Sequence, residues 1–130
     1  MSLTHEELWG FESKWNLEIA ERGFTAVPNA LLEGYTYLGM TPTEFLIFIN
    51  IDSFRWGADQ NPFPSIKTLA KRTGLAERSV TRNITSLEKR MLLERWPRDN
   101  SSNENYFGVG IDRLTDFIDW DNCGIPPGPN

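Results

Sequence analysis

Cysteine, histidine and long apolar runs are scarce in this sequence of 130 residues, which contains one Cys and one His. A lone Cys123 excludes an intrachain disulfide, and with His5 as its sole companion it cannot form a Cys/His metal cluster. No apolar run approaches the roughly 20 residues of a membrane span, and the first residues lack the basic start and apolar stretch of a signal peptide. We therefore expect a cytoplasmic protein that uses no metal or cofactor, and no small-molecule ligand is indicated.

Apolar residues are present in the proportion of a folded domain, but the charge is uneven. Hydrophobic residues make up 39% of the chain and aromatic residues 12%, which is enough for one domain with its own core. Residues 64–98 hold nine Lys or Arg and three Glu, whereas the rest of the chain holds four basic and fifteen acidic residues. This segregation would turn one end of the molecule toward a polyanion, unless the basic run is merely a solvated helix face.

Helix-start signals divide the first half of the chain. Thr4 to Glu7 has the form of a capping box and predicts a helix over residues 4–22, and Pro28 to Gly34 indicates one or two helical turns. The clearest start signal is Thr41-Pro42-Thr43-Glu44, with a Thr cap, Pro at the first helical position and Glu at the third. The residues that follow, up to Trp56, are apolar nearly all round, which predicts a central core helix.

A pair of helices separated by a glycine comes next. The first is predicted over Ser65 to Thr73, and Gly74 can supply its left-handed cap. The second is predicted from Glu77 to Met91, with an apolar stripe made by Val80, Ile84, Leu87 and Met91. The residues that point the opposite way are Arg78, Arg82, Thr85 and Lys89. Two helices joined by a short turn containing Gly are the signature of a helix-turn-helix.

The chain after the second helix predicts a β-hairpin. Residues 92–96 and 106–111 are rich in aromatic and aliphatic side chains, and the stretch between them, residues 97–105, is polar. A short helix that packs Leu114, Phe117 and Ile118 is expected next, followed by a flexible end.

The stretch "PSIKTLAKRTGLAERSVTRNITSLEK", with "GFTAVPNALL" and "MTPTEFLIFINIDSF" before it and "NENYFGV" after it, resembles a winged helix-turn-helix DNA-binding domain. This is the type found in bacterial, phage and plasmid regulators and replication initiators, and it implies a mostly α fold with a small β-hairpin wing. The resemblance divides the chain into an N-terminal helical extension (1–22), a winged helix-turn-helix domain (23–112) and an acidic C-terminal tail (113–130). Two positions depart from the family pattern, because Ala76 stands where Ser or Thr often caps the second helix and Arg90-Met91 where Gly often follows it.

The resemblance implies binding of double-stranded DNA, with the second helix in the major groove and the first across the backbone. Arg78 and Arg82 are expected to read bases, because Arg pairs bidentately with guanine. Shorter candidates for base or phosphate contacts are Ser79, Thr81 and Thr85. The expected phosphate contacts are Lys67, Thr68, Lys71 and Lys89, and Arg95 and Arg98 could reach phosphate or a minor groove. For Thr68, Arg72 and Arg90, contacts within the protein are an equally good interpretation.

The leading hypothesis is a non-enzymatic, sequence-specific DNA-binding protein that regulates transcription. Two alternatives stay open: the DNA-binding domain of a phage or plasmid replication initiator, and a winged helix that binds a protein partner. An enzyme is disfavoured, because the sequence offers no plausible catalytic triad and no Gly-rich phosphate loop. A homodimer is a further hypothesis, which rests on apolar residues near both ends of the chain: Trp9, Phe11, Trp15, Phe117, Ile118 and Trp120. An equally good interpretation is that these segments cover the core of the same monomer.

Overall fold

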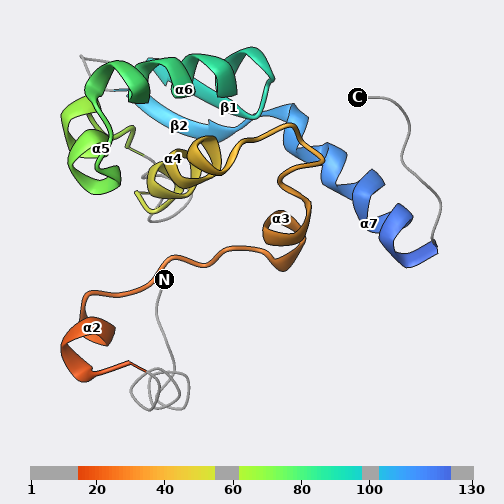
Figure 1. Cartoon of the computed structure of the whole chain (residues 1–130), viewed down its shortest axis with the longest axis horizontal. Coiled ribbons are helices and arrows are strands. Elements are labelled where there is room, and N and C mark those ends of the chain that lie inside the picture. Colours follow the sequence, from red (N-terminus) through yellow and green to blue (C-terminus); the bar gives the residue numbers. More distant parts are fainter. Residues whose placement is uncertain (1–14, 55–61, 98–102, 124–130) are drawn as a thin grey trace.

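The computed structural model describes residues 15–54, 62–97 and 103–123. In these residues short helices dominate, and one antiparallel two-stranded sheet follows the helix pair (Figure 1). The elements in chain order are α2 (Leu17–Glu21), α3 (Asn29–Gly34), α4 (Pro42–Asp52), α5 (Ile66–Thr73), α6 (Glu77–Lys89), β1 (Leu93–Pro97), β2 (Asn103–Phe107), the 3₁₀ helix η1 (Val109–Arg113) and α7 (Leu114–Cys123). This arrangement confirms the expected fold class, a mostly α winged helix-turn-helix with a small hairpin.

Helix α4 begins at the start signal that the sequence contains. The Thr41 Oγ1 accepts a hydrogen bond from the Glu44 backbone N–H, and the Glu44 carboxylate accepts one from the Thr41 N–H, both at 3.1 Å. Pro42 occupies the first turn, where its missing N–H has no cost. The predicted capping box is therefore confirmed, and α4 ends at Asp52, while Trp56 lies outside the described residues.

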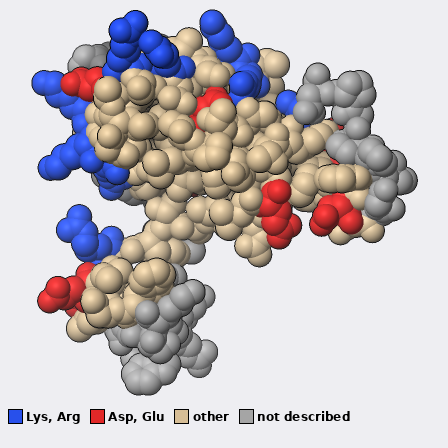
Figure 2. Space-filling view, viewed as in Figure 1, with Lys and Arg blue, Asp and Glu red and all other residues tan. Residues whose placement is uncertain are grey.

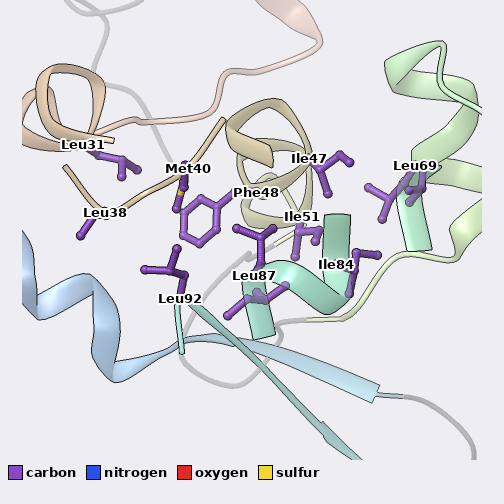
Figure 3. Close-up of a cluster of buried hydrophobic side chains, with 12 residues drawn as sticks. Leu31, Leu38, Met40, Ile47, Phe48, Ile51, Leu69, Ile84, Leu87 and Leu92 are labelled. Atoms are coloured by element: carbon purple, nitrogen blue, oxygen red, sulfur yellow. The ribbon is translucent and has the colours of Figure 1, made fainter. Parts of the chain in front are cut away.

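The hydrophobic core lies between α4, the helix pair α5–α6 and the chain that leads into β1. Its buried residues are Leu31, Leu38, Met40, Ile47, Phe48, Ile51, Leu69, Val80, Ile84, Leu87, Leu92 and Leu93. Figure 3 shows Phe48 and Ile51 of α4 directed toward Leu87 and Leu92. Burial of one such side chain stabilises the fold by about 1.5–3 kcal/mol, so this cluster fixes the position of α6. The prediction that α4 is the central helix is confirmed, although its Leu46 is exposed.

The two strands form the hairpin that the sequence predicts, with different bounds. Leu93 pairs with Phe107 and Pro97 with Asn103, and the Phe107 ring stacks on Phe48 with centroids 5.4 Å apart. Residues 103–105, expected in the loop, belong to β2, and Pro97 belongs to β1. The second strand ends at Phe107, so residues 109–111, expected in that strand, are the start of η1 instead.

A close backbone contact explains why β2 ends there. A Cβ on Gly108 would lie 2.0 Å from the Met91 carbonyl oxygen, and the Gly110 N–H donates to that same oxygen at 2.7 Å. The chain therefore leaves the sheet after Phe107 because its backbone docks on Met91, and a side chain at Gly108 would prevent this approach.

Met91 lies outside the apolar stripe of α6. Its φ is 59°, a left-handed conformation that costs a residue other than glycine about 1–2 kcal/mol. Helix α6 ends at Lys89, and the left-handed turn moves Met91 out of the helical register, so that its side chain is 57% exposed. The expectations that α6 extends to Met91 and that Met91 joins the buried stripe are wrong. This turn occupies the position at which the family often has Gly.

The predicted helix over residues 4–22 is not continuous. The Asn16 Oδ1 accepts a hydrogen bond from the Ile19 N–H at 2.9 Å, and the Asn16 backbone is extended, so α2 begins at Leu17. The prediction of one unbroken helix over residues 4–22 is wrong, because Asn16 has the dihedral angles of an N-cap. Residues 1–14, which include the predicted cap Thr4, lie outside the described residues. Figure 1 shows α2 at the end of an extended segment, away from α4, α5 and α6.

Helix α7 packs against the segment that contains α3. Phe117 is buried, with its ring centroid 6.1 Å from that of Tyr37, and the Arg113 guanidinium donates to the Tyr37 carbonyl oxygen at 3.2 Å. The short helix expected in this stretch is confirmed, and Leu114 and Phe117 pack inward as expected, whereas Ile118 is exposed. The three-part division of the chain stays a prediction.

Candidate nucleic-acid interface

Helix α5 and the turn after it set the direction of α6. The Ser65 Oγ caps α5 by accepting the Thr68 N–H at 3.1 Å, and Leu69 is buried while Lys67 and Lys71 are exposed. Gly74 ends the helix with a φ of 75°, and nothing lies within 4 Å of the position its Cβ would take. The backbone conformation rather than crowding therefore favours glycine here. The helix pair and its glycine turn are confirmed, except that α6 ends at Lys89 instead of Met91.

Helix α6 separates an apolar face from a polar one. Val80, Ile84 and Leu87 are buried against α4 and α5. The exposed residues on the opposite side, at spacings of four, three and four, are Arg78, Arg82, Thr85 and Lys89. At about 100° per residue these four side chains fall within one narrow sector of the helix. We call them the α6 line. Packing of the buried face thus holds this line toward solvent.

Most of the predicted site residues lie on the surface of the protein. Exposed are Lys67, Lys71, Arg78, Thr81, Arg82, Thr85, Lys89 and Arg95, and partly buried are Thr68 and Ser79. Arg98 lies outside the described residues. An open hollow of about 520 Å³ runs along α6 from its middle to its C-terminal end, lined by Thr81, Arg82, Thr85, Ser86, Lys89 and Arg90. Polar hydroxyls and cations thus surround one concave surface.

Arg90 lies at the rim of this hollow but is bound to the protein. Its Nη1 is 3.2 Å from the Glu44 Oε1 and also donates to the Gly39 carbonyl oxygen. Glu44 is only 4% exposed, and a buried carboxylate needs hydrogen-bonding partners. The same carboxylate caps α4, so Arg90 ties the end of α6 to the start of α4. Sequence reasoning identified Glu44 as a capping residue but missed its ion pair, because Arg90 is 46 residues away.

Two further arginines of the basic segment also have protein partners. The Arg95 Nη2 is 3.1 Å from the Glu88 Oε1, and its guanidinium lies 4.9 Å from the centroid of the Phe63 ring. The Arg72 Nη1 is 2.7 Å from the Ser53 Oγ, and its guanidinium lies 4.6 Å from the centroid of the Phe54 ring. Arg95, predicted to touch phosphate or a groove, is thus engaged in joining the wing to α6.

Several polar side chains make local contacts within their helices. The Thr68 Oγ1 is 2.9 Å from the Ser65 Oγ, and the Thr81 Oγ1 donates to the Glu77 carbonyl oxygen at 3.0 Å. Ala76, the position that departs from the family pattern, provides no side-chain cap for α6. In the part of the chain that the structure describes, no hydrogen bond or ion pair engages the side chains of Arg78, Arg82 or Lys89.

The basic side chains of the helix pair and the acidic side chains of α3 and α7 lie on different sides of the molecule. Figure 2 shows Lys and Arg side chains over α5 and α6, and Asp and Glu side chains on the side that carries α3 and α7. The exposed acidic residues of α3 and α7 are Glu33, Asp116, Asp119 and Asp121. A polyanion approaching the molecule would therefore be attracted by the helix pair and repelled by the opposite end.

The described residues carry neither a metal-binding cluster nor a membrane-spanning helix. These residues contain no group of three or more His, Cys, Asp and Glu side chains that could hold a metal ion. None of the described helices is long and apolar enough to cross a membrane.

The comparison with known protein families agrees with this architecture. Residues 38–93 match the model of a family described as a helix-turn-helix domain. A solved structure described as the N-terminal domain of a DNA-binding protein is similar to this chain, with 15% sequence identity and a TM-score of 0.47, covering 87% of this chain and 97% of that one. No curated protein matches the sequence. Since the matched range begins before α4 and contains α5, the Gly74 turn and α6, residues 38–93 of this chain form a helix-turn-helix domain.

Proposed function

We propose that this protein binds double-stranded DNA in a sequence-specific, non-enzymatic manner, and that it acts as a regulator of transcription. The observation that carries the proposal is the α6 line, which projects from a helix held by the core and includes cations that no described residue pairs with. The helix-turn-helix domain at residues 38–93 supports DNA binding.

In this proposal α6 lies in the major groove, which is wide enough to admit an α-helix. Its N-terminal half, with Arg78 and Arg82, contacts base edges, while α5 crosses the phosphate backbone. Lys67 and Lys71 of α5 and Lys89 at the end of α6 contact phosphates, which position the protein without carrying sequence information. The acidic residues on α3 and α7 limit binding of DNA in other orientations.

A random-sequence selection tests this function. The protein is titrated into a pool of random duplexes at several salt concentrations, beside the double variant Arg78→Ala, Arg82→Ala, and the retained DNA is sequenced. We expect one enriched motif that the variant loses, and an affinity that falls steeply as salt rises, because cations that bind phosphates release counterions.

The control variant carries the same change in net charge at a distance from α6. Arg22→Ala with Asn29→Asp alters exposed positions at the end of α2 and the start of α3, and should leave the enriched motif unchanged. No retention of DNA at low salt would contradict the proposal and favour a winged helix that binds a protein partner. Retention without an enriched motif would contradict sequence specificity.

A role in replication initiation would use the same contacts with DNA. The two functions differ in the location of their sites, since a regulator acts at promoters and an initiator at an origin. Mapping the selected motif onto the genome or element that encodes the protein distinguishes them, and a cluster of repeated motifs at an origin would contradict the transcriptional proposal.

We further propose that the protein is a homodimer joined through its N-terminal segment. Helix α2 buries none of its residues, and its Leu17 and Ile19 are 54% and 51% exposed. Apolar side chains in a helix that stands apart from the core favour contact with a second copy. Of the residues named for this hypothesis, Phe117 packs within its own chain, and Trp9 and Phe11 lie outside the described residues. Light scattering that gave a monomer mass at high concentration would contradict the dimer.

A further inference from the structure

Two arginines on α6 have no competing partner among the described residues and lie one helical turn apart. Arg78 and Arg82 are both exposed, and four residues along a helix correspond to about 6 Å along its axis. Arg72, Arg90 and Arg95 of the same basic segment are instead bound to Ser53, Glu44 and Glu88 respectively. The protein therefore presents a pair of arginines at one fixed spacing rather than a diffuse cluster.

The chemistry of the guanidinium group selects the base. Its planar fork of N–H donors matches two acceptors side by side, and in the major groove guanine presents such a pair, O6 and N7. Adenine presents one acceptor and one donor, cytosine a donor, and thymine one acceptor beside a methyl group. A free arginine held over base edges therefore favours guanine.

The spacing limits where the two guanines lie. Successive base pairs are about 3.4 Å apart along the duplex, so about 6 Å along α6 corresponds to no more than about two base steps. Lys89 lies eleven residues beyond Arg78, or about 16 Å along the helix, which places it outside this window. We infer that α6 recognises two guanines within three consecutive base pairs of its DNA site, one read by Arg78 and the other by Arg82.

This inference rests on the proposed function and is tested on the enriched duplex itself. Each guanine in the site is replaced in turn by 7-deazaguanine, which keeps Watson–Crick pairing but lacks the N7 acceptor. We expect two positions, within one window of three base pairs, at which the replacement weakens binding about 10-fold. Replacement of guanines elsewhere in the site should change affinity less than 2-fold.

Single variants assign each guanine to one arginine. In Arg78→Ala, deazaguanine at one of the two positions should no longer weaken binding, while deazaguanine at the other should still do so. In Arg82→Ala the two positions should behave the other way round. Arg82→Lys keeps the positive charge but lacks the planar fork, so deazaguanine at the corresponding position should weaken binding less than it does with Arg82. Lys89→Ala should keep both sensitivities, because it removes a phosphate contact.

The outcomes separate this inference from the proposed function. Sequence-specific binding in which deazaguanine has no effect, or in which the sensitive positions do not depend on Arg78 and Arg82, would overturn the guanine pair and leave the proposed function standing. Failure to retain any DNA at low salt would remove both. Circular dichroism of each variant shows whether it is folded, and both arginines are exposed, so we expect native spectra.

Discussion

The middle of α6 and the residue that follows it carry the same residue type in different circumstances. Arg82, near the middle of the helix, is exposed and is not paired with any described residue, whereas Arg90, directly after the helix, is held by the Glu44 carboxylate and the Gly39 carbonyl oxygen. The difference shows that a count of positive charges overstates how many are available to a ligand. Of the nine basic residues in 64–98, three are bound within the protein and Arg98 lies outside the described residues. The remaining five are Lys67, Lys71, Arg78, Arg82 and Lys89.

The largest effect on stability is expected at Glu44. Replacement by Ala removes the bond to the Thr41 N–H, the ion pair with Arg90 and buried volume, so Glu44→Ala should lower the free energy of unfolding by about 2–3 kcal/mol. Arg90 is about two-fifths exposed and can be solvated, which keeps the loss below that of a fully buried pair. Urea denaturation measures this loss of stability, with Glu33→Ala, at an exposed position, as the control. If the two variants were equally stable, the ion pair with Glu44 would not stabilise the protein, and Arg90 would not differ from Arg82 in this respect.

Replacement of Arg90 should mainly lower stability, whereas replacement of Arg82 should mainly lower DNA affinity. Arg90→Ala should cost about 1–2 kcal/mol of unfolding free energy, because Glu44 keeps its capping bond but loses its cation. Arg82→Ala should change stability by less than about 0.5 kcal/mol and weaken binding of the selected duplex about 10-fold. If Arg90→Ala reduced affinity as much as Arg82→Ala in fully folded protein, Arg90 would be a DNA contact.

Lys89 sharpens the comparison, because it adjoins Arg90 yet has no partner among the described residues. Lys89→Ala should change the unfolding free energy by less than about 0.5 kcal/mol. It should reduce the magnitude of the slope of log affinity against log salt by about 0.9, the value for one phosphate contact. Fluorescence anisotropy at four or five salt concentrations provides the slope. The matched charge change Arg22→Ala should leave it unaltered, and a Lys89→Ala slope equal to that of the unmodified protein would contradict the phosphate contact.

The smallest effect is expected for the pair Arg95–Glu88. Both side chains are about one-third exposed, so a double-mutant cycle should give a coupling energy of about 0.2–1 kcal/mol. Because Arg95 is engaged with Glu88 and Phe63, Arg95→Ala should also leave the salt slope of DNA binding unchanged. A decrease in the slope by about 0.9 would show that Arg95 leaves these partners to bind a phosphate.

The sequence predicted the helix pair well because its signals are local. Ser65, Gly74 and the buried stripe of α6 act over spacings of a few residues, so a period and a turn residue suffice to place both helices and the α6 line. The same approach placed the start of α4 correctly from four consecutive residues.

The remaining features depend on contacts between distant residues or on dihedral angles that many residues could adopt. The partner of Arg90 lies 46 residues earlier, and nothing in the local pattern of either residue identifies the other. Met91 continued the apolar period of α6, but the chain turns left-handed there to meet Gly108 and Gly110, which a period cannot show. Asn16 is a good N-cap in any helix-forming stretch, but the capping-box pattern of Thr4 to Glu7 predicted a helix that begins earlier.

The joint between α6 and the wing has a consequence for protein engineering. The hairpin is attached through the backbone of Met91, which accepts the Gly110 N–H and leaves room for Gly108, and through the ring of Phe107 on Phe48. Two side chains of β1 add to this joint, because Leu93 is buried in the core and Arg95 pairs with Glu88 of α6. A foreign hairpin grafted beyond the Arg95–Asn105 pair keeps all of these contacts and should be carried at the native angle, which makes the tip of the wing an exchangeable module on a constant helix pair.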